Sequence, residues 1–192
     1  MRKRETATSG QTRIRTAATV IASICVVAWA LSSCSARQNR ATTERDAIDS
    51  LLISRVDSLY THPAEMEQRF RDAQRNVTDS TAYYKLELFA GYCQFLLGDF
   101  NRAIEVNQTV LHYCNRHPEA AALEGICWNH RFALLHDMNQ KDSAIICLHH
   151  AYDAIYRSTD HRELESVCIN LADQYRLKGD FADASKYYRK AL

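Results

Sequence analysis

The chain has 192 residues, of which only 5 are Gly and 2 are Pro. Sandwiches, barrels and nucleotide-binding units need both residues for their turns, so this scarcity favours an all-α fold. Residues 1–33 hold 5 of the 24 Lys and Arg but one of the 23 Asp and Glu, which leaves 19 basic and 22 acidic residues afterwards. The acidic remainder excludes the basic surface that nucleic-acid binding requires.

Residues 1–33 have the order of a secretory signal: a basic stretch, an apolar run over 17–31, then small residues. Fifteen residues are fewer than the ~20 that span a bilayer comfortably. The tetrapeptide that ends in Cys34, Leu-Ser-Ser-Cys, resembles the lipobox of bacterial lipoproteins. The resemblance implies that Cys34 is acylated and becomes the first residue of the mature chain. An uncleaved signal anchor is the alternative.

Either alternative ties the rest of the chain to a membrane outside the cytoplasm. No Asp follows Cys34 directly, and in lipoproteins such an Asp resembles an inner-membrane retention signal. The resemblance therefore implies a lipid-anchored protein of the cell envelope that faces the periplasm, in the outer membrane rather than the inner one.

Residues 34–40 are interpreted as a tether, and two helices are expected after it. Ile48, Leu52 and Leu59 are among the apolar residues at helical spacing that predict a helix over 41–60. A second helix is predicted over 63–76. The region 41–79 is thus expected to be a helical pair or a degenerate repeat.

The rest of the chain contains a motif that recurs three times. Its last copy reads Leu-Ala at 171–172, Gly-Asp-Phe at 179–181 and Ala at 184. This copy resembles the tetratricopeptide repeat. Copies are expected at about 80–116, 119–158 and 161–192, and their first packing positions, Gly91, Phe132 and Ala172, lie 41 and 40 residues apart. That period resembles the longer, roughly 40-residue variants of the family.

The resemblance implies a right-handed α-solenoid of antiparallel helix pairs, preceded by the signal-peptide helix. Asp99 and Asp180 are predicted to cap the second helices of their pairs. The middle turn has no Gly. The family pattern places four aromatic residues between pairs: Phe100, Trp128, Tyr175 and Phe181.

The family's ligand groove lies along the first helix of each pair. The resemblance projects these partner-binding positions onto Lys85, Tyr92, Asn129, His130, His136, Asn170, Asp173 and Arg176. Asn170 matches an Asn that binds peptide backbone in related long repeats. The alternative is that these side chains are simply the solvated face of the helices.

Catalytic and metal-binding patterns are not found in the sequence. Adjacent His149 and His150 would point about 100° apart on a helix, so no metal site and no cofactor are expected. Cys93, Cys114, Cys127, Cys147 and Cys168 follow the repeat spacing. They are interpreted as core thiols, with one or two disulfides as the alternative in an oxidising compartment.

The leading hypothesis is a non-enzymatic scaffold that binds a protein or peptide, as the input segment of a longer envelope signalling protein. An outer-membrane lipoprotein that helps to capture glycans or nutrients is the alternative. An enzyme using His or Cys is the least favoured. The sequence stops inside a predicted helix, at Leu192, which suggests that the natural protein continues.

Overall fold

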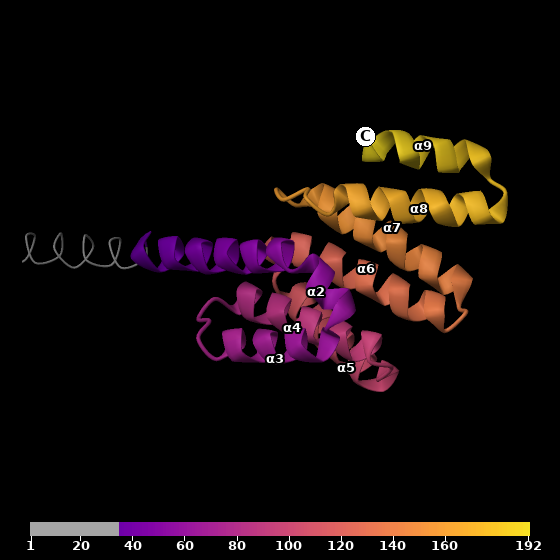
Figure 1. Cartoon of the computed structure of the whole chain (residues 1–192). Coiled ribbons are helices and arrows are strands. Elements are labelled where there is room, and N and C mark those ends of the chain that lie inside the picture. Colours follow the sequence, from indigo (N-terminus) through magenta and orange to yellow (C-terminus); the bar gives the residue numbers. More distant parts are fainter. Residues whose placement is uncertain (1–34) are drawn as a thin grey trace, which may run out of the picture. The chain divides into compact units, whose positions relative to one another are not determined.

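The computed structural model describes residues 35–192, and every regular element in this range is helical (Figure 1). The all-α prediction is confirmed for that part of the chain. Residues Glu44–Leu192 form one compact unit. The predicted signal segment and Cys34 lie outside the described residues.

Residues 35–54 are helical. The other helices are α2 (Val56–Thr61), α3 (Pro63–Gln74), α4 (Ser80–Leu96), α5 (Phe100–Arg116), the short 3-10 turn η1 (Pro118–Ala120), α6 (Ala121–Asp137), α7 (Lys141–Arg157), α8 (Leu164–Lys178) and α9 (Phe181–Ala191). The single helix predicted over 41–60 is interrupted at Arg55, whose φ of −127° and ψ of 14° are not helical. The helix predicted over 63–76 is present as α3.

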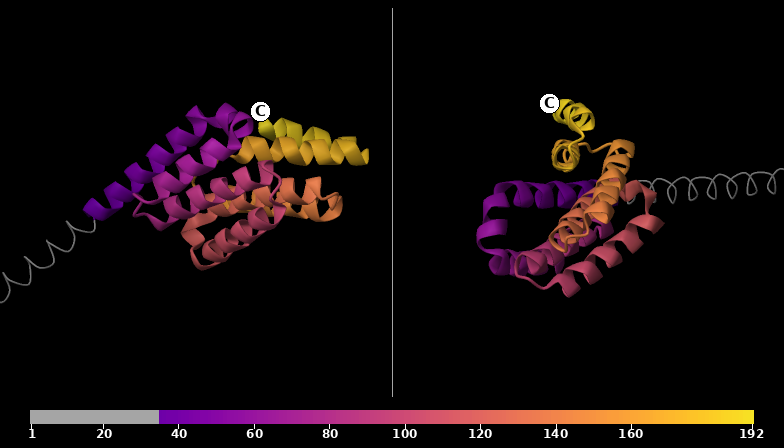
Figure 2. Two further views of the ribbon diagram at one scale, coloured as in Figure 1. Left: turned by 60° about the horizontal axis from the view of Figure 1, so that its bottom comes forward. Right: turned by 90° about the vertical axis from the view of Figure 1, so that its right-hand side faces the viewer.

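From α3 onward each helix packs against the next one along the chain, as the two views of Figure 2 show. We call α4, α6 and α8 the first helices and α5, α7 and α9 the second helices. The second helix of each pair thus folds back on the first. First helices α4 and α6 are also in contact with each other.

The chain reverses from first to second helix through the same backbone turn three times. Gly98, Asn139 and Gly179 have φ of 89°, 59° and 81°, a left-handed conformation that few side chains tolerate. In each turn this residue donates to the carbonyl three residues back, and the next residue donates to the carbonyl five back, at 2.8–3.1 Å. These bonds satisfy helix-end carbonyls. The turns lie 41 and 40 residues apart, so the sequence period is also a backbone period.

The first and third turns continue into a capped helix, and the middle one does not. Asp99 accepts from the Arg102 N–H at 3.0 Å, and Asp180 accepts from the Asp183 N–H at 3.1 Å. Both predicted caps are confirmed. Gln140 occupies the same position in the middle turn and makes no side-chain cap. The middle turn therefore carries both an Asn where its counterparts have Gly and an uncapped helix.

Asn139→Gly should stabilise the protein, because Gly has no Cβ to strain the left-handed conformation at this position. We expect the free energy of unfolding, measured by urea titration of the full chain, to rise by up to about 1 kcal/mol. Asn139→Ala should lower it by about 1 kcal/mol. Met138→Gly is the control, since Met138 has an ordinary φ of −76°; a gain at Met138 as large as that at Asn139 would contradict the argument.

Two glycines allow first and second helices to approach closely. A Cβ on Gly91 of α4 would lie 2.6 Å from Val106 Cγ1 of α5. The expected packing role of Gly91 is confirmed. Gly125 had no predicted role, but a Cβ there would lie 2.3 Å from Ile155 Cγ1 and 3.1 Å from the Ala151 carbonyl oxygen of α7. In the middle pair, the closest approach is thus at Gly125 rather than at Phe132.

Gly125→Ala should destabilise the protein by about 1–3 kcal/mol, because Ile155 must leave its rotamer or the helices must separate. The effect should shrink in an Ile155→Ala background, because the contacts with Ile155 are removed and only the 3.1 Å approach to the Ala151 carbonyl oxygen remains. A double-mutant cycle by urea unfolding measures this coupling. Ser143→Ala, on the exposed face of α7, is the control. Additive effects at residues 125 and 155 would refute the contact.

The core passes from one helix pair to the next without interruption. Leu88, Val110 and Cys127 belong to a cluster that joins α4, α5 and α6, and Leu148 and Leu171 belong to one that joins α7, α8 and α9. Of the four aromatic residues expected between pairs, Trp128, Tyr175 and Phe100 pack against these clusters or a smaller one. The fourth expectation was wrong, because Phe181, at the start of α9, is 70% exposed.

The segment 44–61 is fastened across the first helices rather than trailing from them. Ile48 and Leu59 join Phe70 and Leu86 in a buried cluster. Arg45 donates two hydrogen bonds of 2.8 Å to Asp79, the N-cap of α4. Burial alone would raise the pKa of Asp79, but the bonds from Arg45 and from the Ala82 N–H outweigh it and lower that pKa. The segment therefore forms a wall over α4.

Candidate functional site

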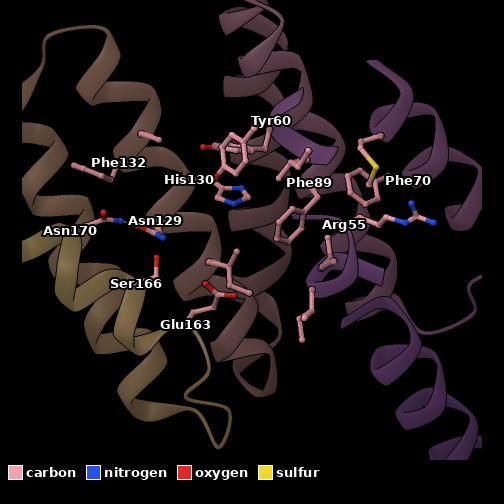
Figure 3. A pocket seen from close by; sticks show the side chains of 17 residues that line it. Arg55, Tyr60, Phe70, Phe89, Asn129, His130, Phe132, Glu163, Ser166 and Asn170 are labelled. Carbon is pink, nitrogen blue, oxygen red and sulfur yellow. Dashed lines mark hydrogen bonds between the residues drawn. The ribbon is translucent and has the colours of Figure 1, made fainter. Parts of the chain in front are cut away.

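A cavity of about 470 Å³ lies where this wall faces the first helices (Figure 3). Such a volume falls in the range of ligand pockets. We call it the central cavity. Residues from segment 52–60, α3 and α4 contribute Leu52, Ile53, Arg55, Leu59, Tyr60, Met66, Phe70, Phe89 and Tyr92 to its lining, and residues from α6 and the start of α8 contribute Ile126, Asn129, His130, Phe132, Ala133, Glu163, Ser166 and Asn170. One side is thus mainly apolar and the other carries most of the polar groups.

Aromatic rings from four elements form a continuous wall of the central cavity. The His130 ring stacks on Tyr92 with centroids 4.4 Å apart and meets the edge of Phe89 at 5.0 Å. Tyr60 contacts Tyr92 at 6.4 Å, and Phe70 contacts Phe89 at 6.1 Å. Because the rings come from α2, α3, α4 and α6, the wall depends on the segment 44–61 being in place.

His130 is neutral in this setting. Burial lowers its pKa to about 3, since desolvation disfavours the charged imidazolium. Its Nδ1 is buried without a hydrogen-bond partner in the described part of the chain. Burial also raises the pKa of Tyr92 well above its usual range, so the phenol stays protonated. The aromatic wall therefore carries no charge near neutral pH.

The opposite side of the central cavity presents two amides. The side-chain Nδ2 of Asn170 donates a hydrogen bond to the side-chain Oδ1 of Asn129 at 2.9 Å, which links α8 to α6 (Figure 3). One amide group can donate and accept at once, so the pair retains an Nδ2 donor on Asn129 and an Oδ1 acceptor on Asn170. Those two groups match the carbonyl and the N–H of a peptide unit.

A group of charged residues surrounds the end of the cavity near the start of α8. Asp49, 8% exposed, accepts hydrogen bonds from Lys85 and, at 2.6 Å, from Arg162. Arg162 also donates to Asp160 at 2.8 Å. Glu163 lines the cavity itself, and burial raises the pKa of its carboxyl group despite nearby Lys85. Asp49 thus ties the helix that contains it, residues 35–54, to α4 and to the loop before α8.

The structure brings together half of the eight residues projected for the groove. Tyr92, Asn129, His130 and Asn170 line the central cavity, and Lys85 lies at its charged end through Asp49. The other three lie elsewhere on the first helices. The nearest described partner of His136 is Asp137, at 3.7 Å; Asp173 accepts from Tyr188 at 2.6 Å and from Arg176 at 3.3 Å.

Sequence reasoning missed Tyr60, Phe89 and Glu163. Glu163 and Ser166 precede Asn170 by seven and four residues, so helical spacing from Asn170 could have found them. Phe89 lies two residues before Gly91, the small position of the family motif, and no motif position marked it as a cavity residue. Nothing in the sequence indicated that Tyr60 and its segment would cover the first helices.

The five cysteines of the described chain, Cys93, Cys114, Cys127, Cys147 and Cys168, are free and buried, which confirms their interpretation as core thiols. Burial raises the pKa of each thiol, to about 12 for Cys93 and Cys114. A thiol with so high a pKa supplies little nucleophilic thiolate. The residues described contain no group of three His, Cys, Asp or Glu placed to hold a metal ion.

No protein-family model matches the chain, and no curated protein matches it. Within residues 35–192, none of the helices combines the length and the hydropathy that a bilayer crossing requires.

Asp49→Asn should destabilise the protein by about 1–3 kcal/mol, because it leaves the half-buried Lys85 without a charged partner. Asp72→Asn is the matched control: its ion pair with Arg75, at 3.1 Å, is exposed and should change the free energy of unfolding by less than about 0.5 kcal/mol. Urea unfolding of the full-length variants measures both. Equal, small losses would show that Asp49 does not fasten the segment.

Proposed function

We propose that the chain is a non-enzymatic helical-repeat scaffold, similar to the long tetratricopeptide repeats, that binds a protein or peptide partner along its first helices. The recurrence of one backbone turn at Gly98, Asn139 and Gly179 supports a right-handed solenoid of helix pairs. Such repeats stack so that each buries its apolar face against the next, and they bind partners along an extended inner surface.

The central cavity carries this proposal. It gathers Tyr92, Asn129, His130 and Asn170, which the family pattern assigned to ligand binding. The Asn129–Asn170 pair offers a donor and an acceptor to a peptide backbone, and the aromatic wall offers apolar surface to a side chain. A peptide needs both, because unpaired backbone groups are costly to bury.

The electrostatics of the described residues favour binding over catalysis. The buried thiols have raised pKa values and His130 has a lowered one. No cysteine there makes a hydrogen bond to a histidine. Acid–base and nucleophilic catalysis both need a pKa matched to the working pH, so these groups suit a packing or binding role.

The N-terminal sequence supports a place at the cell envelope. We infer that Cys34 is acylated, that it anchors the protein on the periplasmic side of the outer membrane, and that the repeats act as the input segment of a longer signalling protein. This inference rests on the resemblance of residues 31–34 to a lipobox.

A phage-displayed library of random 12-residue peptides, selected against the full chain, tests the binding proposal. We expect enriched peptides whose affinity falls at least about tenfold in Asn129→Ala/Asn170→Ala, because two hydrogen bonds of ~0.5–1.5 kcal/mol each are lost. Asn76→Ala/Asn101→Ala, at two exposed sites, is the matched control, and thermal unfolding confirms that all variants fold. Selection that yields no peptide dependent on Asn129 and Asn170 would refute the proposal.

A further inference from the structure

The central cavity contains a carboxylate that the protein does not neutralise. Within the described residues, the side-chain carboxylate of Glu163 makes no hydrogen bond and no ion pair, although Glu163 lines the cavity. The cations near it are already engaged: Lys85 binds Asp49, and Arg162 binds both Asp49 and Asp160. Around the cavity end, two cations therefore meet three carboxylates, and Glu163 is the one left without a partner.

The cavity walls suit an organic cation as well. Tyr60, Tyr92 and Phe89 line the same cavity as Glu163, and the faces of aromatic rings attract cations, most strongly where water is excluded. His130 completes this wall as a neutral ring. Arg55 also borders the cavity, but it is exposed and its guanidinium points away from Asn129 and Asn170 (Figure 3).

We propose that the central cavity binds the basic side chain of the partner peptide, a Lys or an Arg, between its aromatic wall and Glu163. The inference rests on the proposed function and deepens it, because it names the chemistry of the residue that the partner inserts. The apolar stem of such a side chain would lie against Phe89 and Tyr92. Its charge would meet Glu163, and the peptide backbone beside it would reach the amides of Asn129 and Asn170.

The charge balance and the size of the site agree with this occupant. One added cation equalises the charges at the cavity end. A volume of about 470 Å³ exceeds the lower limit of ~300 Å³ for ligand pockets, so the cavity accommodates a long side chain together with part of its backbone. Burial raises the pKa of Glu163, which is the expected sign for a carboxylate that lacks a compensating cation.

NMR titration of the full chain with side-chain analogues tests the inference directly. We expect n-butylammonium and n-butylguanidinium to bind at least about tenfold more tightly than 1-butanol, which has a similar stem and no charge. Glu163→Gln should reduce both cations to the level of the alcohol. Glu165→Gln, at an exposed residue two positions further along the chain, is the matched control and should leave all three affinities unchanged.

Equal binding of cations and alcohol, no binding of any analogue, or equal effects of Glu163→Gln and Glu165→Gln would overturn the inference. The peptide selection separates it from the proposed function. Enriched peptides that need Asn129 and Asn170 but contain no fixed Lys or Arg would refute the cation site and leave the scaffold proposal standing. Cation binding that depends on Glu163, with no peptide enriched, would refute the scaffold proposal and leave the cation site standing.

Discussion

The arrangement of the helices depends on a backbone constraint at three reversals. At Gly98, Asn139 and Gly179 one residue adopts a positive φ, and the hydrogen bonds around it end the first helix and aim the chain into the second. Because the turns recur every 41 and 40 residues, side chains one period apart lie at the same level on neighbouring first helices. Asn129 and Asn170 are 41 residues apart and share a hydrogen bond; Phe89 and His130 are 41 apart and their rings touch. These two contacts in the cavity lining are therefore consequences of the repeat period.

The side of the cavity that the segment 44–61 forms depends on a buried charge. Without the segment 44–61, the aromatic rings of the first helices would line an open face. Asp49 connects this segment to Lys85 and to Arg162, which is 113 residues further along the chain. Buried ion pairs stabilise little in themselves, because desolvation offsets the attraction, but removing one partner is costly. Asp49 thus contributes chiefly by fixing where the segment lies, and the size of the cavity follows from that position.

The local features of the fold could be predicted from the sequence, and the covering segment could not. Gly98 and Gly179 act through their own backbone, and Asp99 and Asp180 act on backbone N–H groups three residues further on, so these local roles were visible in the sequence. Asn139 replaces Gly in the middle turn, and Gly125 provides the middle pair with a close approach at a different position from that of Gly91 in the first pair, because each helix pair packs with its own side chains. Half of the projected groove residues reach the cavity, since they follow the period; His136, Asp173 and Arg176 do not, because the segment 44–61 covers only part of the first helices. Its helical spacing predicted a helix but carried no information on what that helix packs against.

The cavity holds two titratable groups whose burial penalises opposite protonation states. The pKa of His130 is lowered to about 3. The native state therefore loses stability as pH falls from about 6.5 towards that value, because this histidine binds a proton in the unfolded chain and stays neutral in the native one. The pKa of Glu163 is raised from its ordinary 4.5, so its penalty appears as pH rises through 4.5, when the unfolded chain ionises more readily than the native one. At neutral pH the histidine penalty is absent and the glutamate penalty is present. Of the two, only the glutamate penalty can be relieved by a ligand at neutral pH, and the group that relieves it is a cation.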